Sequence, residues 1–396
     1  MSDRYDAVII GAGPAGLAAG IVLARHGLRV LIADRARLPI DKVCGEGILP
    51  PGVARLRQLG VHDHLDPAQT RPFAGIAMRS TLGTVASAPF AEGPGLGIRR
   101  LNLSRALQRA VQRFDGIDLR EGVLVRDLQA TRDGTDIQLD GRRVHARLLI
   151  GADGLNSRVR RWAGLDAGRQ RLERLGARQH FRVPAWNDHV EVHYGHGIEA
   201  YVTPCADELV GVAFLWHRGC RPCIPGGAAM VPALLSAFPP LARRLRDAPT
   251  ASTMHGVGPM HRVARAPCAD GVILLGDAAG FLDACTGEGT SLALAEALSL
   301  EQTVVPILRA GREKPTRDAF APFARAWADI TRPYYQTTRL LLTLARHPHC
   351  FDRLVSAFKT HPDLMQHFLS AQTGHAPLWP GWSGAARLVR AFLLGH

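Results

Sequence analysis

A glycine-rich turn near the start constrains the fold more than any other feature of the chain. Residues 5–10 are an apolar run, GAGPAG follows at residues 11–16, and a helical pattern covers residues 17–25. Residues 29–33 are apolar again and predict a second strand. This order makes a βαβ unit, whose GxGxxG turn lets backbone N–H groups approach a pyrophosphate. Asp34 ends the second strand, where its carboxylate can accept a hydrogen bond from a ribose hydroxyl.

The turn and the end of the second strand supply the first predicted ligand contacts. A glycine-rich turn without a ligand is the alternative, and the carboxylate after the second strand argues against it. A single GxGxxG occurs in the chain, which indicates one dinucleotide-binding domain rather than two. We assign these contacts to Gly11, Gly13, Pro14, Ala15, Gly16, Asp34 and Arg35.

Composition narrows the class of protein. A length of 396 residues allows two or more domains, and 46% hydrophobic with 21% charged residues is ordinary globular usage. The net charge of +13 suits anionic partners, such as a nucleotide diphosphate, an acidic carrier protein or an anionic membrane surface. We expect no nucleic acid, because the basic residues are spread along the chain without a recognisable binding motif.

The sequence predicts neither a membrane span nor a metal site. No apolar run reaches the length of about 18 residues that a span needs, so we expect a cytoplasmic protein. Cys220 and Cys223 form a CxxC, but no second pair completes a zinc site, and we assign it no function. For His189, His193 and His196 we favour pocket lining or plain surface over metal binding.

Two later motifs identify the nucleotide by resemblance. Residues 151–154 read GADG, with Ser157 and Arg160 following, and residues 276–280 read GDAAG after the apolar run 272–275. Together they resemble signatures of the para-hydroxybenzoate hydroxylase-like superfamily, which includes aromatic hydroxylases, flavin halogenases and geranylgeranyl reductases. The resemblance implies one FAD.

The same resemblance implies further FAD contacts. Asp277 matches the aspartate that hydrogen-bonds the ribityl chain. Residues 287–290 match a segment leading into a helix whose positive N-terminus faces the flavin and stabilises its reduced, negative form. Arg105 matches a flavin-contacting arginine, with a solvent-exposed helix arginine as the alternative. The implied contacts are Cys44, Gly45, Arg105, Val125, Asp153, Gly276, Asp277, Gly287, Gly289 and Thr290.

Within this family the finer resemblance is to the geranylgeranyl reductase branch. KVCGEG at residues 42–47 and GFLDACTGEG at residues 280–289 look like its two signature segments. Ala284 stands where that branch usually has proline, and the C-terminal region carries no usable motif, so the substrate does not transfer. Hydroxylases normally show histidine where Gly280 stands, and the halogenase lysine motif is absent.

Three residues of the first signature are our predicted catalytic group. Cys44 would lie near the flavin, as the matching cysteine does in the reductases, with a buried small hydrophobe as the alternative. Lys42 could lower the pKa of the Cys44 thiol. Glu46 is either a proton donor or base, or a solvated loop carboxylate.

The pattern of predicted elements gives the domain order. We expect an α/β fold, with a Rossmann-type FAD-binding domain, an inserted antiparallel β-sheet substrate domain and C-terminal helices. Strands are predicted at residues 73–79 and 119–128, among others. Tyr201, Thr203 and Pro204 align loosely with substrate-facing positions, and Gly258-Pro259 with a turn over the flavin. The predicted ranges are FAD-binding in 1–71, 97–171 and 257–305, substrate-binding in 72–96 and 172–256, and helical in 306–396.

These observations predict an FAD-dependent oxidoreductase with an apolar pocket. We favour a monooxygenase acting on a hydrophobic aromatic or polyketide-like substrate that a carrier protein could hold. Reduction of isoprenoid-type C=C bonds is the close alternative, and a non-catalytic redox sensor is a third. NADPH or NADH is the expected donor, docking on the FAD domain's surface near Arg158 and Arg160.

The C-terminal segment carries a separate hypothesis. Trp379 and Trp382 precede residues 385–394, in which Leu388, Val389, Phe392 and Leu393 could share one helical face. That face would either contact a membrane surface, making the protein peripheral, or pack on the protein's own core, which we favour.

Overall fold

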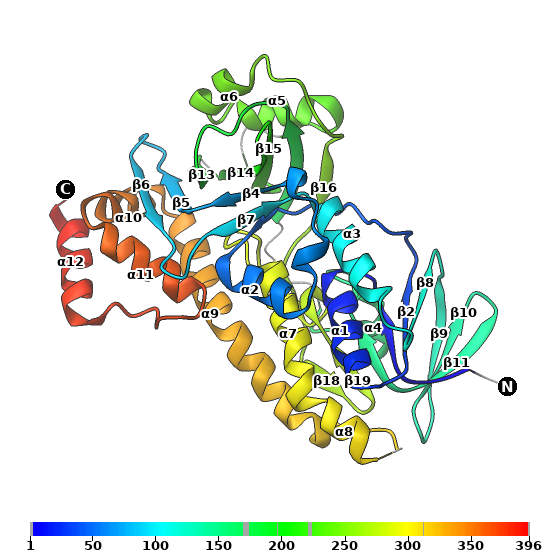
Figure 1. Cartoon of the computed structure of the whole chain (residues 1–396). Helices are drawn as coiled ribbons and strands as arrows, with labels where there is room; N and C mark the ends of the chain where they lie inside the picture. Colours follow the sequence, from blue (N-terminus) through cyan, green and yellow to red (C-terminus); the bar gives the residue numbers. More distant parts are fainter. Residues whose placement is uncertain (1–2, 169–173, 196, 221–223, 312, 395–396) are drawn as a thin grey trace.

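The predicted α/β architecture is confirmed in the computed structural model, which describes residues 3–168, 174–195, 197–220, 224–311 and 313–394 (Figure 1). Its eight-stranded sheet holds β1 (Asp3–Ile10) between β2 (Val30–Asp34) and β11 (Arg142–Gly151), parallel to both. The other strands of this sheet are β8 (Ile117–Glu121), β9 (Val125–Ala130), β10 (Thr135–Leu139), β18 (Cys268–Ala269) and β19 (Val272–Leu274).

Residues 7–10 of β1, 30–33 of β2 and 148–150 of β11 are apolar and buried because both faces of this sheet are covered here. On one face Ala7 and Ile9 pack in a core with α1 (Pro14–Arg25), α3 (Arg100–Val111) and α7 (Gly289–Thr303). On the other face the alternate β1 residues join a second core. The stretch Gly289–Ala310, α7 with α8 (Val305–Ala310), is long and apolar enough to cross a membrane, but over half of it is buried within this fold.

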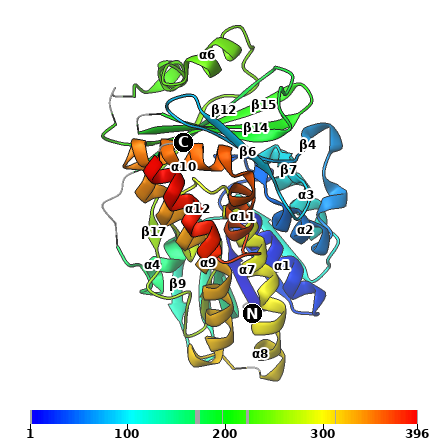
Figure 2. The same ribbon diagram turned by 90° about the vertical axis from the view of Figure 1, so that its left-hand side faces the viewer.

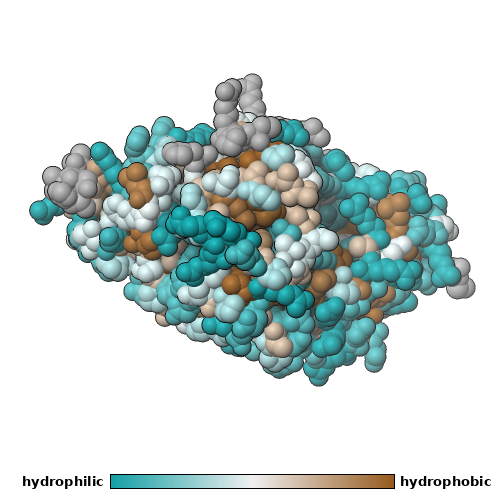
Figure 3. Space-filling model, turned by 90° about the horizontal axis from the view of Figure 1, so that it is seen from above, coloured by the Kyte–Doolittle hydropathy of each residue, from teal (hydrophilic) through white to brown (hydrophobic). Residues whose placement is uncertain are grey.

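A seven-stranded sheet is inserted into the nucleotide-binding domain. Its strand order is β16-β12-β15-β14-β13-β5-β6, antiparallel except where β13 runs parallel to β5. One face packs on α5 (Met230–Leu235) and α6 (Pro239–Leu245), which lie at the top of Figure 1. Viewed from that side, apolar residues gather toward the middle of a largely hydrophilic surface (Figure 3). The strands are β5 (Gly75–Arg79), β6 (Val85–Pro89), β12 (Arg174–Phe181), β13 (His189–Tyr194), β14 (Ile198–Ala206), β15 (Leu209–His217) and β16 (His255–Val257).

Smaller elements and the C-terminal helices complete the molecule. The last helices gather on one side, over β5 and β6, as Figure 2 shows. A three-stranded sheet, β3-β7-β4, packs beside β14 of the seven-stranded sheet. These elements are α2 (Pro50–Gln58), α4 (Arg158–Trp162), α9 (Ala321–Ala345), α10 (Pro348–Thr360), α11 (Pro362–Gln372), α12 (Gly381–Leu394), β3 (Gly47–Ile48), β4 (Thr70–Phe73), β7 (Gly95–Ile98), β17 (Arg262–Val263) and β20 (Gly280–Phe281).

Two predicted strands are each two strands in the structure. The segment 73–79 divides because Ala74 leaves the three-stranded sheet and donates its N–H to the Asp188 carbonyl, so β4 and β5 belong to different sheets. The segment 119–128 divides at Gly122, whose φ of 71° turns the chain between β8 and β9. Strand β12 was not predicted, and the predicted boundary at 171/172 lies outside the described residues.

Candidate active site

A large cavity extends between the two big sheets. Its volume is about 770 Å³, and its wall runs from the glycine turn to strands β5, β13 and β14 and the C-terminal helices. The predicted residues that line it are Gly11, Gly13, Pro14, Ala15, Asp34, Arg35, Lys42, Cys44, Gly45, Val125, Asp153, Tyr201, Thr203, Gly276, Asp277, Gly287, Gly289 and Thr290.

The three glycines of the turn do different physical work. A Cβ on Gly11, whose φ is +111°, would lie 2.3 Å from the Ala152 carbonyl oxygen, and one on Gly16 would lie 1.9 Å from the Gly11 oxygen. Both positions therefore serve close packing. A Cβ on Gly13 would meet nothing within 4 Å, so at this glycine the backbone faces open space. A pyrophosphate can approach there, at the N-terminal end of α1.

Asp34 holds the turn as well as lining the cavity. One carboxylate oxygen accepts the Ala12 N–H at 2.7 Å and the other accepts the Ala36 N–H at 2.8 Å. Each oxygen keeps a lone pair for a ribose hydroxyl. Asp34 is thus placed for the predicted contact.

Arg105 requires a correction. Its side chain is exposed and is not part of the cavity wall, whereas Arg100, Ser104 and Leu107 of the same helix are. Residues three and four apart share a helix face, and position 105 lies on a different one. The structure supports the exposed alternative for this residue.

Lys42 pairs with Asp277 rather than with Cys44. The Lys42 ammonium lies 2.9 Å from a carboxylate oxygen of Asp277, and both residues line the cavity. Cys44 is half-buried on the same wall, and its sulfur accepts the Glu46 N–H at 3.4 Å. Cys44 and Lys42 thus both lie at the cavity, but the Lys42 ammonium pairs with Asp277, the predicted ribityl-binding residue.

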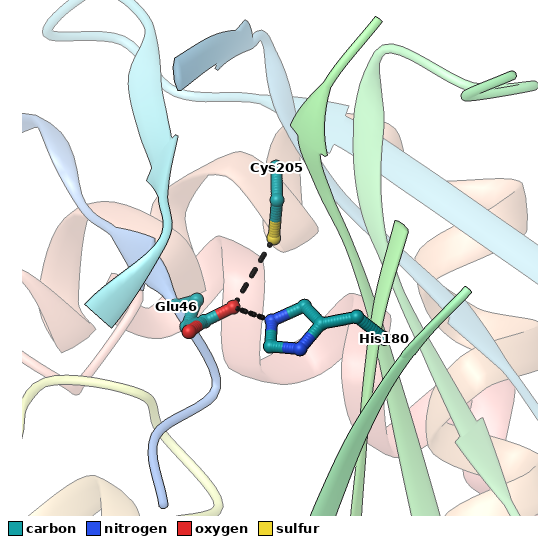
Figure 4. A group of neighbouring side chains, drawn as sticks. All are labelled: Glu46, His180 and Cys205. Carbon is teal, nitrogen blue, oxygen red and sulfur yellow. Dashed lines mark hydrogen bonds and ion pairs between the residues drawn. The ribbon is translucent and has the colours of Figure 1, made fainter. Parts of the chain in front are cut away.

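Glu46 is neither a solvated loop carboxylate nor part of the cavity wall. It is 2% exposed, has a φ of 61°, and accepts hydrogen bonds from the Arg100 N–H at 2.8 Å and from Arg178 at 3.1 Å. Its other oxygen contacts His180 and Cys205 (Figure 4). Burial raises its pKa, but the His180 hydrogen bond and the nearby positive charges outweigh burial and lower it. Glu46 therefore anchors the loop and does not lie on the cavity wall, where a proton donor to the substrate would have to be.

Glu46, His180 and Cys205 are also close enough together to hold a metal ion. Their geometry indicates a hydrogen-bond cluster instead. The Arg178 guanidinium lies 3.2 Å from the His180 ring, and its positive charge would repel a metal cation bound there. Burial raises the pKa of the Cys205 thiol, which disfavours the thiolate that a metal would need. The cluster joins the 42–47 loop to strands β12 and β14.

His189, His193 and Cys220 are not part of the cavity wall. His189 and His193 lie on β13 beside Asp188 and Glu191, at 2.6 and 2.8 Å. His196 and Cys223 lie outside the described residues.

Pro204 is not on the cavity wall, unlike the other two predicted substrate residues. Its carbonyl oxygen would lie 1.8 Å from a Cβ on Gly97, so it packs on β7. Thr203 donates its hydroxyl to the Gly45 carbonyl at 2.7 Å, which ties the substrate sheet to the loop. Gly258 and Pro259 are also off the wall, although Val257 and Met260 line it.

Sequence reasoning missed most of the apolar substrate wall. Its side chains alternate along β5 and β13, a period-two pattern that could have revealed one buried sheet face. It also missed a buried ion-pair cluster of Arg174, Glu199 and Asp283, which lies behind Tyr201. The apolar wall includes Phe73, Ile76, Met78, Val190, Val192, Tyr194, Phe281 and Leu341.

Arg160 also differs from the prediction. It is 2% exposed, bonds Asp166 at 2.8 Å and donates to the Ala278 carbonyl at 3.0 Å. It is a packed structural residue, unlike the exposed Arg158, whose guanidinium lies over the Trp162 ring.

Comparisons with known proteins agree with this geometry. Residues 4–199 match the family described as "FAD binding domain". The chain is 28% identical over 373 residues to the menaquinone reductase of Mycolicibacterium smegmatis, covering 87% of this chain and 86% of that protein. It is 25% identical to digeranylgeranylglycerophospholipid reductase 2 of Methanosphaera stadtmanae, covering 73% and 75%.

A hydroxylase matches over a shorter length. The 3-(3-hydroxy-phenyl)propionate/3-hydroxycinnamic acid hydroxylase of Mycolicibacterium gilvum is 32% identical over 169 residues, 41% of this chain and 30% of that one. Among solved structures, a flavoprotein/dehydrogenase from Cytophaga hutchinsonii superposes with a TM-score of 0.83 at 19% identity, covering 99% and 100%. A variant of halogenase PltM in complex with FAD gives 0.76 at 19% identity, covering 99% and 86%.

Fold, cavity and comparisons together define an FAD-dependent oxidoreductase. The matched domain and the relatives agree with the predicted resemblance to the para-hydroxybenzoate hydroxylase-like superfamily.

Proposed function

We propose that this enzyme uses FAD to reduce C=C bonds of a hydrophobic, isoprenoid-type substrate. The observation that carries this proposal is the length of the matches. The likeness to the two reductases extends over 87% and 73% of the chain, whereas the likeness to the hydroxylase extends over 41%. Because the fold divides into a nucleotide-binding part and a substrate sheet, a match over 87% includes both. The apolar wall of the cavity suits such a substrate.

The residues present fit FAD at the glycine-turn end of this cavity. The pyrophosphate would lie against Gly13, the ribose at Asp34 and the ribityl chain at Asp277. The start of α7, from Gly289, would then stabilise negative charge on the isoalloxazine ring. When bound and reduced, FAD supplies a hydride, and the protein must exclude water, orient the alkene and deliver a proton.

NADPH or NADH is the proposed source of electrons. The described part of the chain contains one nucleotide-binding sheet, so the donor would dock transiently at the cavity's mouth, where exposed Arg158 and Arg161 line the wall. Two arginines there can bind phosphate groups.

Anaerobic single turnover tests the reaction. The holoenzyme is reduced with dithionite and mixed with a digeranylgeranyl phospholipid or with menaquinone, and products are analysed by mass spectrometry. A product that gains two hydrogens per reduced C=C bond in its isoprenoid chain, rather than at the quinone ring, with reoxidised flavin, is expected. Formation of an oxygenated product on adding O₂, with a flavin hydroperoxide spectrum, would favour the hydroxylase that our sequence analysis preferred. A yellow protein that converts neither substrate would favour the redox sensor.

A further inference from the structure

A buried ion-pair cluster lies directly behind the substrate end of the cavity. Arg174 of β12 is 3% exposed and lies 2.9 Å from Glu199 of β14 and 3.0 Å from Asp283, which are 5% and 2% exposed. Such a cluster is costly to bury, since each charge loses its hydration. It joins the substrate sheet to the segment that precedes α7.

Tyr201 connects this cluster to the cavity. Its ring is part of the cavity wall, and its hydroxyl lies 2.7 Å from a carboxylate oxygen of Glu199 and 3.1 Å from the Cys285 carbonyl oxygen. On the other side, Arg174 and Asp283 line a small pocket of about 10 Å³, with His217, His261 and Arg346. That volume is close to what one water needs. Polar groups therefore continue from the cavity wall toward this second pocket.

The charge balance of the cluster allows one of its two carboxylates to hold a proton. One guanidinium faces two carboxylates, so the second carboxylate is only partly compensated. Burial raises the pKa of Asp283 to about 6, Arg174 opposes this, and Glu199 adds to it. The groups that face the cluster include Tyr194, Cys285 and Tyr334, whose pKa values burial raises well above their usual range, so they stay neutral. His217, His261 and Arg346 face it from the small pocket, and burial lowers the pKa of both histidines, which favours their neutral form.

We propose that Tyr201 delivers the substrate's proton and that the Glu199–Arg174–Asp283 cluster positions and resupplies it. This proposal rests on the proposed reductase function. The hydride from reduced FAD forms a C–H bond at one alkene carbon, and the π electron pair takes the Tyr201 hydroxyl proton at the other. The Tyr201 oxygen regains a proton from the cluster through Glu199, to which its hydroxyl is hydrogen-bonded. Net consumption is the alkene, reduced flavin and one proton.

Tyr201→Phe is the main test, because it keeps the ring and removes only the hydroxyl. Glu199→Gln is the second variant, and it also disturbs the Arg174 ion pair. Tyr5→Phe is the matched control, since its hydroxyl donates to Asp118 at 2.6 Å, beside Arg120, on the nucleotide sheet. Holoenzymes are reduced with dithionite, and flavin reoxidation is followed anaerobically from pH 5 to pH 9 with two acceptors. One is a digeranylgeranyl phospholipid and the other is menadione, a small quinone whose reduction by hydride also requires a proton and which therefore probes the same proton donor without a lipid chain.

The wild-type rate should fall as pH rises above about 6, because the cluster then loses its stored proton. In Tyr201→Phe the rate should drop by about 10²-fold and lose this pH dependence with both acceptors, while dithionite reduction and FAD content stay unchanged. Tyr5→Phe should match wild type. Tyr201→Phe rates near wild type, with the wild-type pH profile on menadione, would overturn the proposal. If wild type reoxidises with menadione but saturates no lipid double bond, the proposed function fails, and the proton site is still judged on menadione.

Discussion

Glu46 shows how one side chain can determine the shape of a cofactor-facing loop. Its carboxylate satisfies Arg178 and His180, and its positive φ sets the direction of the chain after Cys44. Glu46→Gln keeps the size but removes the charge, leaving a buried guanidinium short of a partner. The free energy of unfolding should fall by about 3 kcal/mol in urea titrations near neutral pH. Exposed Glu301→Gln is the control and should change it by less than about 0.5 kcal/mol.

The pH dependence follows from the lowered pKa of Glu46. A carboxyl whose folded pKa lies below its unfolded value of 4.5 stabilises the fold above that value and loses the contribution as pH falls further. The stability gap between wild type and Glu46→Gln should therefore shrink below about pH 4.5. A gap that is constant from pH 7 to pH 3 would contradict the charged, anchoring role.

Cys44→Ser tests one of the two predicted catalytic residues, Lys42 and Cys44, that lie on the cavity wall. Serine can accept the Glu46 N–H as the thiol does, so the variant should fold and retain FAD. If the polarizable sulfur contacts flavin or substrate, the variant should accept electrons normally yet lose most product formation in the same anaerobic assay. Normal turnover, with unfolding made easier by about 1–3 kcal/mol, would identify Cys44 as a packed small residue instead.

At the scale of elements, different glycines of the glycine turn are needed for folding and for ligand binding. Gly16→Ala would drive a methyl group into the Gly11 carbonyl and push α1 from β1, so we expect loss of soluble, folded protein. Gly13→Ala meets no protein atom, so the chain should fold with a near-normal melting temperature but retain little FAD after dilution. The measurements are flavin-to-protein absorbance ratio and thermal unfolding. Full FAD occupancy in Gly13→Ala would contradict the proposed pyrophosphate position.

The elements that the sequence predicts well are those whose signal is local. The run from β1 to β2 is readable because an apolar period, a glycine turn and a terminal aspartate all fall within about 30 residues. Strand β12 and the Arg174–Glu199–Asp283 cluster have no such signal, because the ion pairs that compensate these buried charges join residues 25 and 109 positions apart in sequence. Glu46 was misread for the same reason: its partners Arg178 and His180 come from an inserted sheet over 130 residues later.

At the scale of the whole molecule, the C-terminal helices close the substrate end of the cavity. Leu341 of α9 and Gln372 of α11 are part of the wall, so these helices contribute directly to the site. In α12, Leu388 and Phe392 pack against the core, as the favoured alternative predicted, whereas Val389 is 57% exposed. The side chain of Leu393 lies outside the described residues.

An exposed aromatic pair remains on this side of the molecule and leads to the last prediction. Trp379, just before α12, and Trp382, in its first turn, are 54% and 85% exposed, with ring centres 5.5 Å apart. Indole rings favour the membrane interface, and a protein of net charge +13 is attracted to anionic lipid. In flotation, wild type should rise with vesicles containing phosphatidylglycerol, and Trp379→Ala/Trp382→Ala should remain at the bottom, while exposed Trp162→Ala should behave as wild type. Equal flotation of wild type and the double variant, or none by either, would remove the membrane surface as a partner and leave the isoprenoid substrate to be delivered by a carrier.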